Sequence, residues 1–345
     1  MRNGIVAGIA GIAALCMLHA GSAAAQRAPA CDRACLEGWV DRYFQAVIDD
    51  DPSQLPMTSD VRFTEDGQRL EVGDGLWNSM KSTGSYRLFV TDVPAQQVAL
   101  IATINEDGRL PSDSVPALIA LRLKIERDRV AEIEQNVVRN ADAADRVNAL
   151  GRPNILYLQT IQRDKRMSRE ALIETANKYF TGMQQNDGKG DYPFTDDCNR
   201  LENGSQSTNA PTPPGQTRPD PATATGYSGQ WSCLEQFQSG LLHFVNRIRD
   251  RRFVAVDQER GLVFSFVFFD HSAGDTRNFT TPDGRHVTAG PAQPWTWYIA
   301  ELFKVENNQI RQIEAILQRV PYGMNSGWSS YEDGMSDRMR DVTGL

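Results

Sequence analysis

Two stretches of the chain place apolar residues along one helical face. Between positions 33 and 50 they recur at alternating intervals of three and one, which predicts an amphipathic helix. Residues 169 to 185 repeat this pattern and place Tyr179-Phe180 where the first stretch has Tyr43-Phe44. The apolar face of the first predicted helix comprises Leu36, Trp39, Val40, Tyr43, Phe44, Val47 and Ile48.

Each predicted helix is followed by a polar turn, by a further region expected to be helical, and then by β-strands. The strand segments are rich in branched and aromatic residues and are broken by Pro, Asp and Gly. In the first half they are residues 86–93, 97–105, 117–126 and 129–139. In the second half they are residues 252–257, 261–271, 295–306 and 309–319.

The last two predicted strands of each half have similar sequences. LKIERDRVAEIEQNVVR begins at Leu123, and FKVENNQIRQIEAILQR begins at Phe303, a displacement of 180 residues without a gap. Identities and same-shape exchanges along one ungapped window indicate an internal duplication.

The order of elements predicts an α+β protein made of two tandem cone-shaped lobes. In each lobe, N-terminal helices are expected to pack on a curved antiparallel sheet, because helices are grouped before strands. The expected boundaries are a first lobe at 33–139, a linker at 140–168, a second lobe at 169–320 and a C-terminal tail at 321–345. A Pro/Thr-rich insertion at about 205–229 is expected to be a mobile surface loop of the second lobe.

The first 25 residues resemble a secretory signal peptide. Arg2 precedes an apolar run, and Ala23 to Ala25 provide small residues before the expected cleavage site. The run is shorter than the roughly 20 residues that a spanning helix needs. The mature protein is therefore expected to be secreted or periplasmic and to have no membrane segment after cleavage.

Export to an oxidising compartment changes how the cysteines are interpreted. Cys31, Cys35, Cys198 and Cys233 remain after cleavage, and an even number favours disulfides over a zinc site, for which paired Cys-x-x-Cys spacing is missing. Of the three pairings, we favour Cys31 with Cys35, one helical turn apart, and Cys198 with Cys233, which closes the irregular stretch between them.

The closing strands and early turns carry a resemblance to a known superfamily. The helix ending in Tyr43-Phe44, the turn FTEDG, the phrase GDGLW and the meander ending in RVAEIEQNVVR resemble the cone-shaped fold of the nuclear transport factor two-like superfamily. The tandem, secreted form is similar to its SnoaL-like, polyketide-cyclase-related branch. The resemblance implies a pocket in the mouth of the cone. Some members use this pocket for acid-base isomerisation, dehydration, cyclisation or epoxide hydrolysis, and others only bind or oligomerise.

Composition and motifs exclude several classes of function. The net charge of -8 does not provide the basic face that nucleic acid requires. The chain has no G-x-S-x-G elbow, phosphate-binding loop or H-E-x-x-H motif. We therefore expect no cofactor, no metal and no nucleic-acid partner, and a hydrophobic or aromatic small molecule as the ligand. The sequence leaves open whether the protein forms a homo-oligomer.

The second half differs from the first in residues that carry chemistry. At the displacement of 180, Glu301 corresponds to Leu121, and Trp295 and Trp297 correspond to Val115 and Ala117. Alternation along a strand puts Glu301 on the same face as both indoles, so its carboxyl group is expected to lie in an aromatic wall. A raised pKa there would suit proton transfer near neutral pH.

Asp270 and His271 follow a strongly apolar strand, where the rim of a pocket is expected. Because they are adjacent, regular alternation turns at most one of them inward, and we favour His271, whose usual pKa lies near working pH. The alternative is a solvated strand end. Tyr179 is expected to reach the same pocket from its helix.

Three further features are candidates for ligand contact. Trp231 and the two strand indoles would supply apolar walls. Most of the arginines in RIRDRRF are expected on a solvated surface at a helix end, and Arg249 or Arg252 would hold a negative group. Residues 321–331 would fold across the mouth of the cone, or else form a frayed terminus.

These patterns support three hypotheses. The first is a cofactor-independent lyase, dehydratase or isomerase with its site in the second lobe and His271, Glu301, Asp270 and Tyr179 as proton-transfer candidates. The second is a periplasmic carrier that uses the same pocket without turnover. The third is an assembly module. The bias of polar pocket residues toward the second lobe favours the first two.

Overall fold

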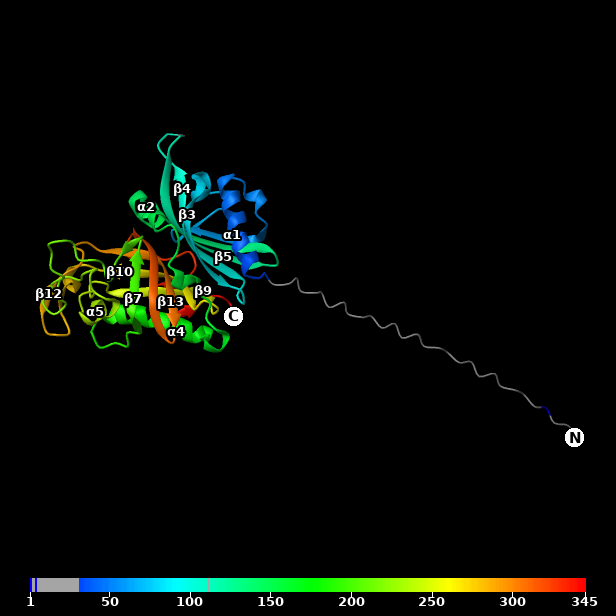
Figure 1. Cartoon of the computed structure of the whole chain (residues 1–345). Helices are drawn as coiled ribbons and strands as arrows, with labels where there is room; N and C mark the ends of the chain where they lie inside the picture. Colours follow the sequence, from blue (N-terminus) through cyan, green and yellow to red (C-terminus); the bar gives the residue numbers. More distant parts are fainter. Residues whose placement is uncertain (2–3, 5–30, 111) are drawn as a thin grey trace.

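Two curved sheets, each covered by a helix on its inner face, form two α+β lobes (Figure 1). The structure is a computed structural model that describes residues 1, 4, 31–110 and 112–345. The predicted signal peptide lies outside the described residues except for Met1 and Gly4. Among the described residues, no helix is long and apolar enough to cross a membrane.

The first lobe begins with helix α1 (Arg33–Ile48), whose N-terminus is capped by the Asp32 side chain accepting from the Cys35 backbone N–H. Its sheet has the order β2-β1-β6-β5-β4-β3. The strands are β1 (Met57–Glu65), β2 (Gln68–Leu70), β3 (Met80–Asp92), β4 (Gln97–Asp107), β5 (Ser114–Glu126) and β6 (Arg129–Val138), with short 3-10 helices η1 (Pro52–Gln54) and η2 (Gly75–Asn78).

The second lobe begins with helix α4 (Arg169–Gln185), capped by Ser168 at its N-terminus and ended by Asn186 in the left-handed conformation. Its sheet has the order β15-β9-β10-β13-β14-β7-β8. The elements are β7 (Phe194–Glu202), β8 (Ser205–Gln206), α5 (Cys233–Gln238), β9 (Arg247–Asp257), β10 (Leu262–His271), β13 (Trp295–Glu306), β14 (Gln309–Val320) and β15 (Arg340–Asp341). A small hairpin of β11 (Asn278–Thr280) and β12 (His286–Thr288) follows η4 (Gly274–Arg277).

Six strands have the same order in the sheets of both lobes, because β2-β1-β6-β5-β4-β3 of the first corresponds to β8-β7-β14-β13-β10-β9 of the second. The near-repeated sequences occupy corresponding strands, β5 and β6 in one lobe and β13 and β14 in the other. The first sheet is antiparallel apart from the parallel pair β1 with β6, and the second apart from the parallel pairs β7 with β14 and β15 with β9. The sequence analysis did not predict β1 and β7, which precede the polar turn of each lobe. The first of these strands is largely polar and only part-buried, so it lacks the alternation of a half-buried strand.

The predicted linker contains ordered elements. Helix α2 (Ala141–Leu150) begins at the Asn140 cap and packs against β5, β3 and β4, and it is followed by α3 (Ile155–Leu158) and η3 (Arg163–Lys165). Ala143, Ala144 and Val147 bury the inner face of α2. The linker is therefore part of the packed structure between the lobes.

The two sheets pack against each other through the faces that their own helices do not cover. On β10, Phe264, Phe266 and Phe268 enter this shared core, whereas Val267 and Phe269 face α4. Both faces of the strand are thus buried, which explains why its sequence is almost continuously apolar. The layers are helix, sheet, sheet and helix.

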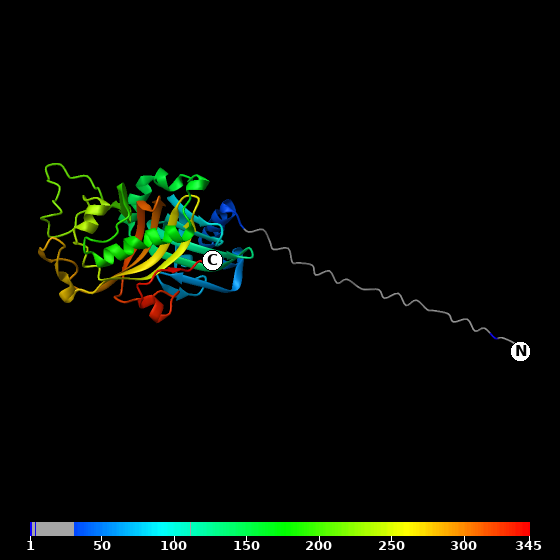
Figure 2. The same ribbon diagram turned by 90° about the horizontal axis from the view of Figure 1, so that it is seen from below.

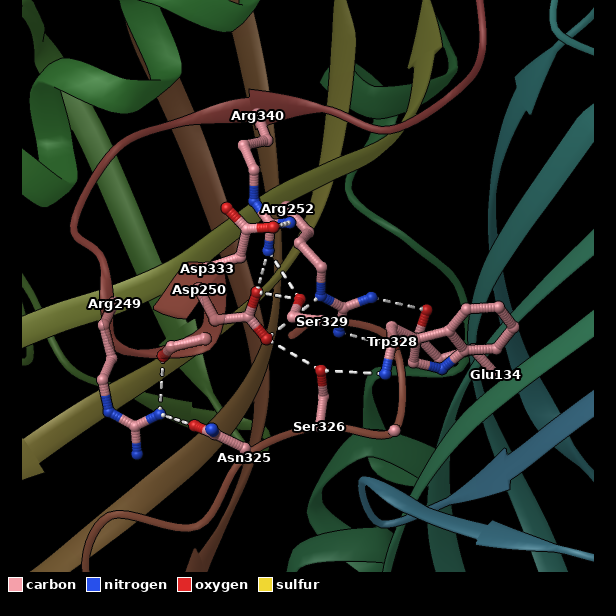
Figure 3. A network of polar contacts seen from close by, with 12 residues as sticks. Glu134, Arg249, Asp250, Arg252, Asn325, Ser326, Trp328, Ser329, Asp333 and Arg340 are labelled. Carbon is pink, nitrogen blue, oxygen red and sulfur yellow. Dashed lines mark hydrogen bonds and ion pairs between the residues drawn. The ribbon is translucent and has the colours of Figure 1, made fainter. Parts of the chain in front are cut away.

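A buried ionic network crosses this shared core (Figure 3). Glu134 on β6 accepts hydrogen bonds from both distal nitrogens of Arg252 on β9, at 2.6 and 3.0 Å, and from the Tyr298 hydroxyl at 3.0 Å. Arg252 also lies 3.3 Å from Asp250.

Arg249, Arg251 and Arg252 are therefore buried strand residues, and the prediction of a solvated helix end was wrong. Carboxylates pair with Arg249 and Arg252. Arg251 instead bonds to uncharged side chains such as Asn177 and Thr181.

The C-terminal tail joins the same network. Ser326 and Ser329 donate to Asp250 at 2.8 and 2.6 Å, and Arg340 also pairs with Asp250. The Trp328 indole N–H donates to Thr64 of the first lobe at 2.7 Å. Beyond α6 (Tyr331–Met335), β15 pairs with β9. The tail thus lies against the strands of the first lobe (Figure 2), on the sheet face opposite α4, and neither frays nor crosses the cone mouth.

A second buried carboxyl group in the shared core has no cation beside it. Glu314 on β14 accepts from the Tyr86 hydroxyl of β3 at 2.7 Å, and its other oxygen receives no hydrogen bond from any described residue. Burial raises the pKa of Glu314 to about 7, although the Tyr86 hydrogen bond lowers it.

We predict that Arg252→Met lowers the free energy of unfolding by about 3 to 5 kcal/mol, because it leaves Glu134 and Asp250 buried with fewer cations. Urea unfolding measures this change. Arg109→Met, at an exposed position, is the control and should change it by less than about 0.5 kcal/mol. Equal effects of the two substitutions would contradict the importance of the network.

We also predict that Glu314→Gln flattens the dependence of stability on pH. The pKa of Glu314 is about 7 in the folded state against the usual 4.5 of a glutamate, so between these values the folded state keeps a proton that the unfolded state loses. Wild-type stability should fall as pH rises from 4.5 to 7, by at most about 3 kcal/mol from this group. The stability of the Glu314→Gln protein relative to the wild-type protein should therefore be higher at pH 8 than at pH 4.5. Thermal unfolding of both proteins across this range measures the difference, and parallel pH profiles would refute the assignment.

Candidate functional site

A small cavity lies in the second lobe between α4 and the inner face of the sheet. Its free volume is about 30 Å³, enough for one or two water molecules. Its wall is mostly apolar and aromatic, with a few polar groups. The lining residues are Tyr179, Met183, Arg200, Glu202, Tyr227, Leu242, Phe244, Val245, Phe269, Trp297, Ile299, Glu301, Ala315 and Leu317.

Regular secondary structure brings the polar groups together. Alternation along β13 turns Trp297, Ile299 and Glu301 toward α4, as the sequence predicted. The apolar stripe of α4 packs on this face and carries Tyr179 into the cavity. Arg200 enters from β7, which pairs with β14.

Glu301 is 1 % exposed, and its Oε2 atom receives no hydrogen bond from any described residue. Burial raises the pKa of Glu301 to about 8; Arg200 and Tyr179 lower it and Glu202 raises it. The carboxyl group is therefore mostly protonated at pH 7 and can give up its proton within one pH unit above that.

Arg200 is a buried cation that sequence reasoning missed. Its Nη1 donates to the Tyr179 hydroxyl at 3.1 Å, its Nη2 to Gln236 at 2.7 Å and its Nε to Ser207 at 3.0 Å. Glu202 lies 3.2 Å from Nε. The signal was present, because the aligned turns place Arg200 where the first copy has the apolar Phe63.

The predicted disulfides Cys31–Cys35 and Cys198–Cys233 are both present. The second joins β7 to α5, close to Arg200 on one side and to Gln236 on the other. Gln236 also donates to the backbone carbonyls of Ser207 and Ser228, at 2.6 and 2.9 Å. The Pro/Thr-rich insertion is thus tied to the site, and its Tyr227 lines the cavity.

His271 lies next to the cavity rather than on its wall. Its ring stacks on Trp295 at 3.9 Å between centroids and meets Trp297 edge-on at 4.7 Å. Neither ring nitrogen hydrogen-bonds to a described residue, and burial lowers the pKa of His271 to about 4. The ring is neutral at pH 7 and serves as part of an aromatic wall behind Trp297.

Two other candidates, Asp270 and Trp231, lie away from the cavity. Asp270 points to the opposite face of β10, where Arg249 donates to it at 2.8 and 3.1 Å and Thr296 at 2.6 Å. Burial raises the pKa of Asp270, but these hydrogen bonds outweigh burial and lower it. Trp231 packs in a separate cluster with Leu241 and donates to the Pro219 carbonyl.

Arg249 and Arg252 therefore do not hold a group in the cavity. Both belong to the face of β9 that meets the first lobe, and both have carboxylate partners there. Adjacent Asp270 and His271 do turn to opposite faces, as regular alternation requires.

The first lobe has different residues at the corresponding positions. Leu121 replaces Glu301, and Gln135 replaces Ala315. Gln135 accepts a hydrogen bond from the Tyr43 hydroxyl at 2.7 Å, and Trp77 packs edge-on against Tyr43. The short Ala315 side chain leaves this space open in the second lobe.

Metal binding has no support in the described part of the chain, where no group of three or more His, Cys, Asp or Glu residues is arranged to hold an ion.

Comparisons with known proteins give little guidance. A family model described as "Domain of unknown function (DUF8021)" matches residues 165–317, which include the cavity. No curated protein matches.

Two solved structures are similar over part of the chain. AclR, a putative hydroxylase from Streptomyces galilaeus, is 12 % identical with a TM-score of 0.26, over 33 % of this chain and 85 % of AclR. A de novo designed protein with a curved β-sheet is 15 % identical with a TM-score of 0.23, over 44 % of this chain and 88 % of the design. At these scores neither supports an argument, and the SnoaL-like resemblance stays a prediction.

We predict that a protonated carboxyl group is detectable in the folded protein above pH 7. Infrared difference spectra should show its carbonyl band disappearing with a midpoint of about 8, the pKa of Glu301. Glu301→Gln should remove that component, and Glu314→Gln should remove only the component that titrates at about 7. Loss of both components in one variant would contradict the assignment.

Proposed function

We propose that the second lobe binds a small, largely apolar or aromatic molecule and transfers a proton to or from it, as in a cofactor-independent lyase, dehydratase or isomerase. The observation that carries this proposal is Glu301, a buried carboxyl group with a free oxygen in an apolar cavity and a pKa of about 8. Groups whose pKa lies near the working pH are the most effective general acids and bases.

The neighbouring groups suit such a reaction. When protonated, Glu301 can donate to a ligand oxygen, and when ionised it can accept a proton from a ligand carbon or hydroxyl. Arg200 and Tyr179 are fixed hydrogen-bond donors that can stabilise negative charge as it develops on the ligand. Trp297 and Phe244 keep water away from the reacting group.

A non-catalytic carrier is the second candidate. Its support is that burial raises the pKa of Tyr179 well above 10, so its hydroxyl is a poor partner for proton transfer, and that His271 does not line the cavity. In either case a larger ligand requires the Tyr227 and Phe244 side chains to move, because the cavity is small.

Export and duplication belong to the same proposal. The two disulfides are compatible with an oxidising compartment, and the signal-like first 25 residues would direct the chain there. The common strand order of the lobes supports duplication, after which the second lobe would have acquired the polar cavity.

The test is a screen of small apolar compounds for binding and turnover, followed by three variants. Glu301→Gln should lower turnover by about 100-fold or more while binding persists. Ala315→Gln, which introduces the residue of the first lobe, should fill the cavity and abolish binding. Glu106→Gln in the first lobe is the control and should change neither.

Unchanged turnover in Glu301→Gln would exclude the acid-base role. Binding without turnover of any compound would favour the carrier. Binding that survives Ala315→Gln would place the ligand outside this cavity.

A further inference from the structure

The cavity contains one buried cation whose distal nitrogens face neutral partners. Arg200 is 2 % exposed, and its Nη1 and Nη2 bond to the uncharged side chains of Tyr179 and Gln236. Its carboxylate neighbour Glu202 sits on the Nε side, at 3.2 Å, and the Glu202 side chain is 29 % exposed. Glu202 also lines the cavity, but neither Nη1 nor Nη2 bonds to a carboxylate of a described residue.

Glu301 completes the polar end of the cavity. Its unpartnered Oε2 belongs to a side chain that is almost fully buried. A buried polar atom without a partner costs free energy, and a ligand that supplies the partner recovers it. Arg200 provides paired N–H donors and protonated Glu301 provides an O–H donor, so these two groups together donate hydrogen bonds to a ligand.

We propose that the ligand of this cavity carries a carboxylate, held between the distal nitrogens of Arg200 and the protonated carboxyl group of Glu301, with an apolar or aromatic body against Trp297 and Phe244. This inference rests on the proposed function and names its substrate class. A planar carboxylate matches the fork of a guanidinium, and charge-assisted hydrogen bonds are roughly twice as strong as neutral ones.

The charges favour a monoanion. Arg200 carries one positive charge, part of which the partly exposed Glu202 already balances, so a phosphate dianion would bury an uncompensated charge in a cavity of about 30 Å³. Ionised Glu301 would repel the ligand carboxylate, so binding requires that Glu301 keep its proton.

Gln236 is the positioning residue for Arg200. Its Oε1 accepts from Nη2, and its Nε2 is fixed by two backbone carbonyls. The Cys198–Cys233 disulfide holds the strand of Arg200 against the helix of Gln236. The guanidinium is therefore oriented before the ligand arrives, which reduces the entropy cost of binding.

The experiment measures, by calorimetry or ligand-observed NMR, the binding of acetate, butyrate and benzoate against acetamide, butyramide and benzamide to the full protein. At least one carboxylate should bind more than about tenfold tighter than its amide, because only the carboxylate pairs with Arg200. Arg200→Met should abolish this preference, and Arg200→Lys should retain part of it. Arg311→Met, on the outer surface of the same lobe, is the matched control and should leave it unchanged.

The wild-type protein also provides a test that needs no variant at Arg200. Carboxylate affinity should be constant from the pKa of the ligand's own carboxyl group up to about pH 8, the pKa of Glu301, and should fall about tenfold per pH unit well above it. Glu301→Gln should bind carboxylates with an affinity independent of pH over this range.

Equal affinity for each carboxylate and its amide overturns the inference, as does an unchanged preference in folded Arg200→Met. These outcomes are separate from the fate of the proposed function. If carboxylates bind as expected but turnover ignores Glu301→Gln, the acid-base role fails and the ligand class stands. If turnover requires Glu301 but Arg200→Met leaves the preference for carboxylates over amides unchanged, the proposed ligand class is wrong and the acid-base role stands.

Discussion

Burial of both sheets on both faces is the constraint on which the rest of the structure depends. Each sheet is covered by its own helix on one side and by the other sheet on the second side. The central strands of both sheets are therefore buried on their outer faces, and the lobes share a common core to which the linker helix α2 also contributes. Hydrophobic burial on this scale provides the main free energy that orders the chain.

The shared core contains polar groups, and two related glutamates show how their surroundings decide their state. Glu134 and Glu314 stand 180 positions apart at corresponding places of β6 and β14. Glu134 is met by Arg252 of the other lobe, whereas Glu314 is met only by the Tyr86 hydroxyl. Breaking a buried ion pair is costly, so the pair of Glu134 with Arg252 holds the two lobes together. Glu314 has no cation beside it, and burial favours its protonated form.

The same fold carries different chemistry in its two inner cores. The replacements of Phe63, Leu121 and Gln135 by Arg200, Glu301 and Ala315 convert a filled core into a cavity with a cation and a carboxyl group. The disulfide and Gln236 belong to the second lobe alone and fix the cation. Polar groups are tolerated there because they are few, they have partners, and the acid can remain neutral.

The sequence alone predicted the long helices α1 and α4, most of the long strands and the disulfide pairs, because periodicity and cysteine spacing can be read directly from the chain. It did not predict helix α2, which lies in the expected linker. It also placed Glu301, Trp297 and Tyr179 on inward faces, since alternation follows from strand geometry. It missed β1 and β7, whose polar sequences are strands only because β6 and β14 offer them edges. It also misjudged Arg249 and Arg252. Their partners lie on distant strands and in the other lobe, and only the packing of the sheets brings those carboxylates within reach.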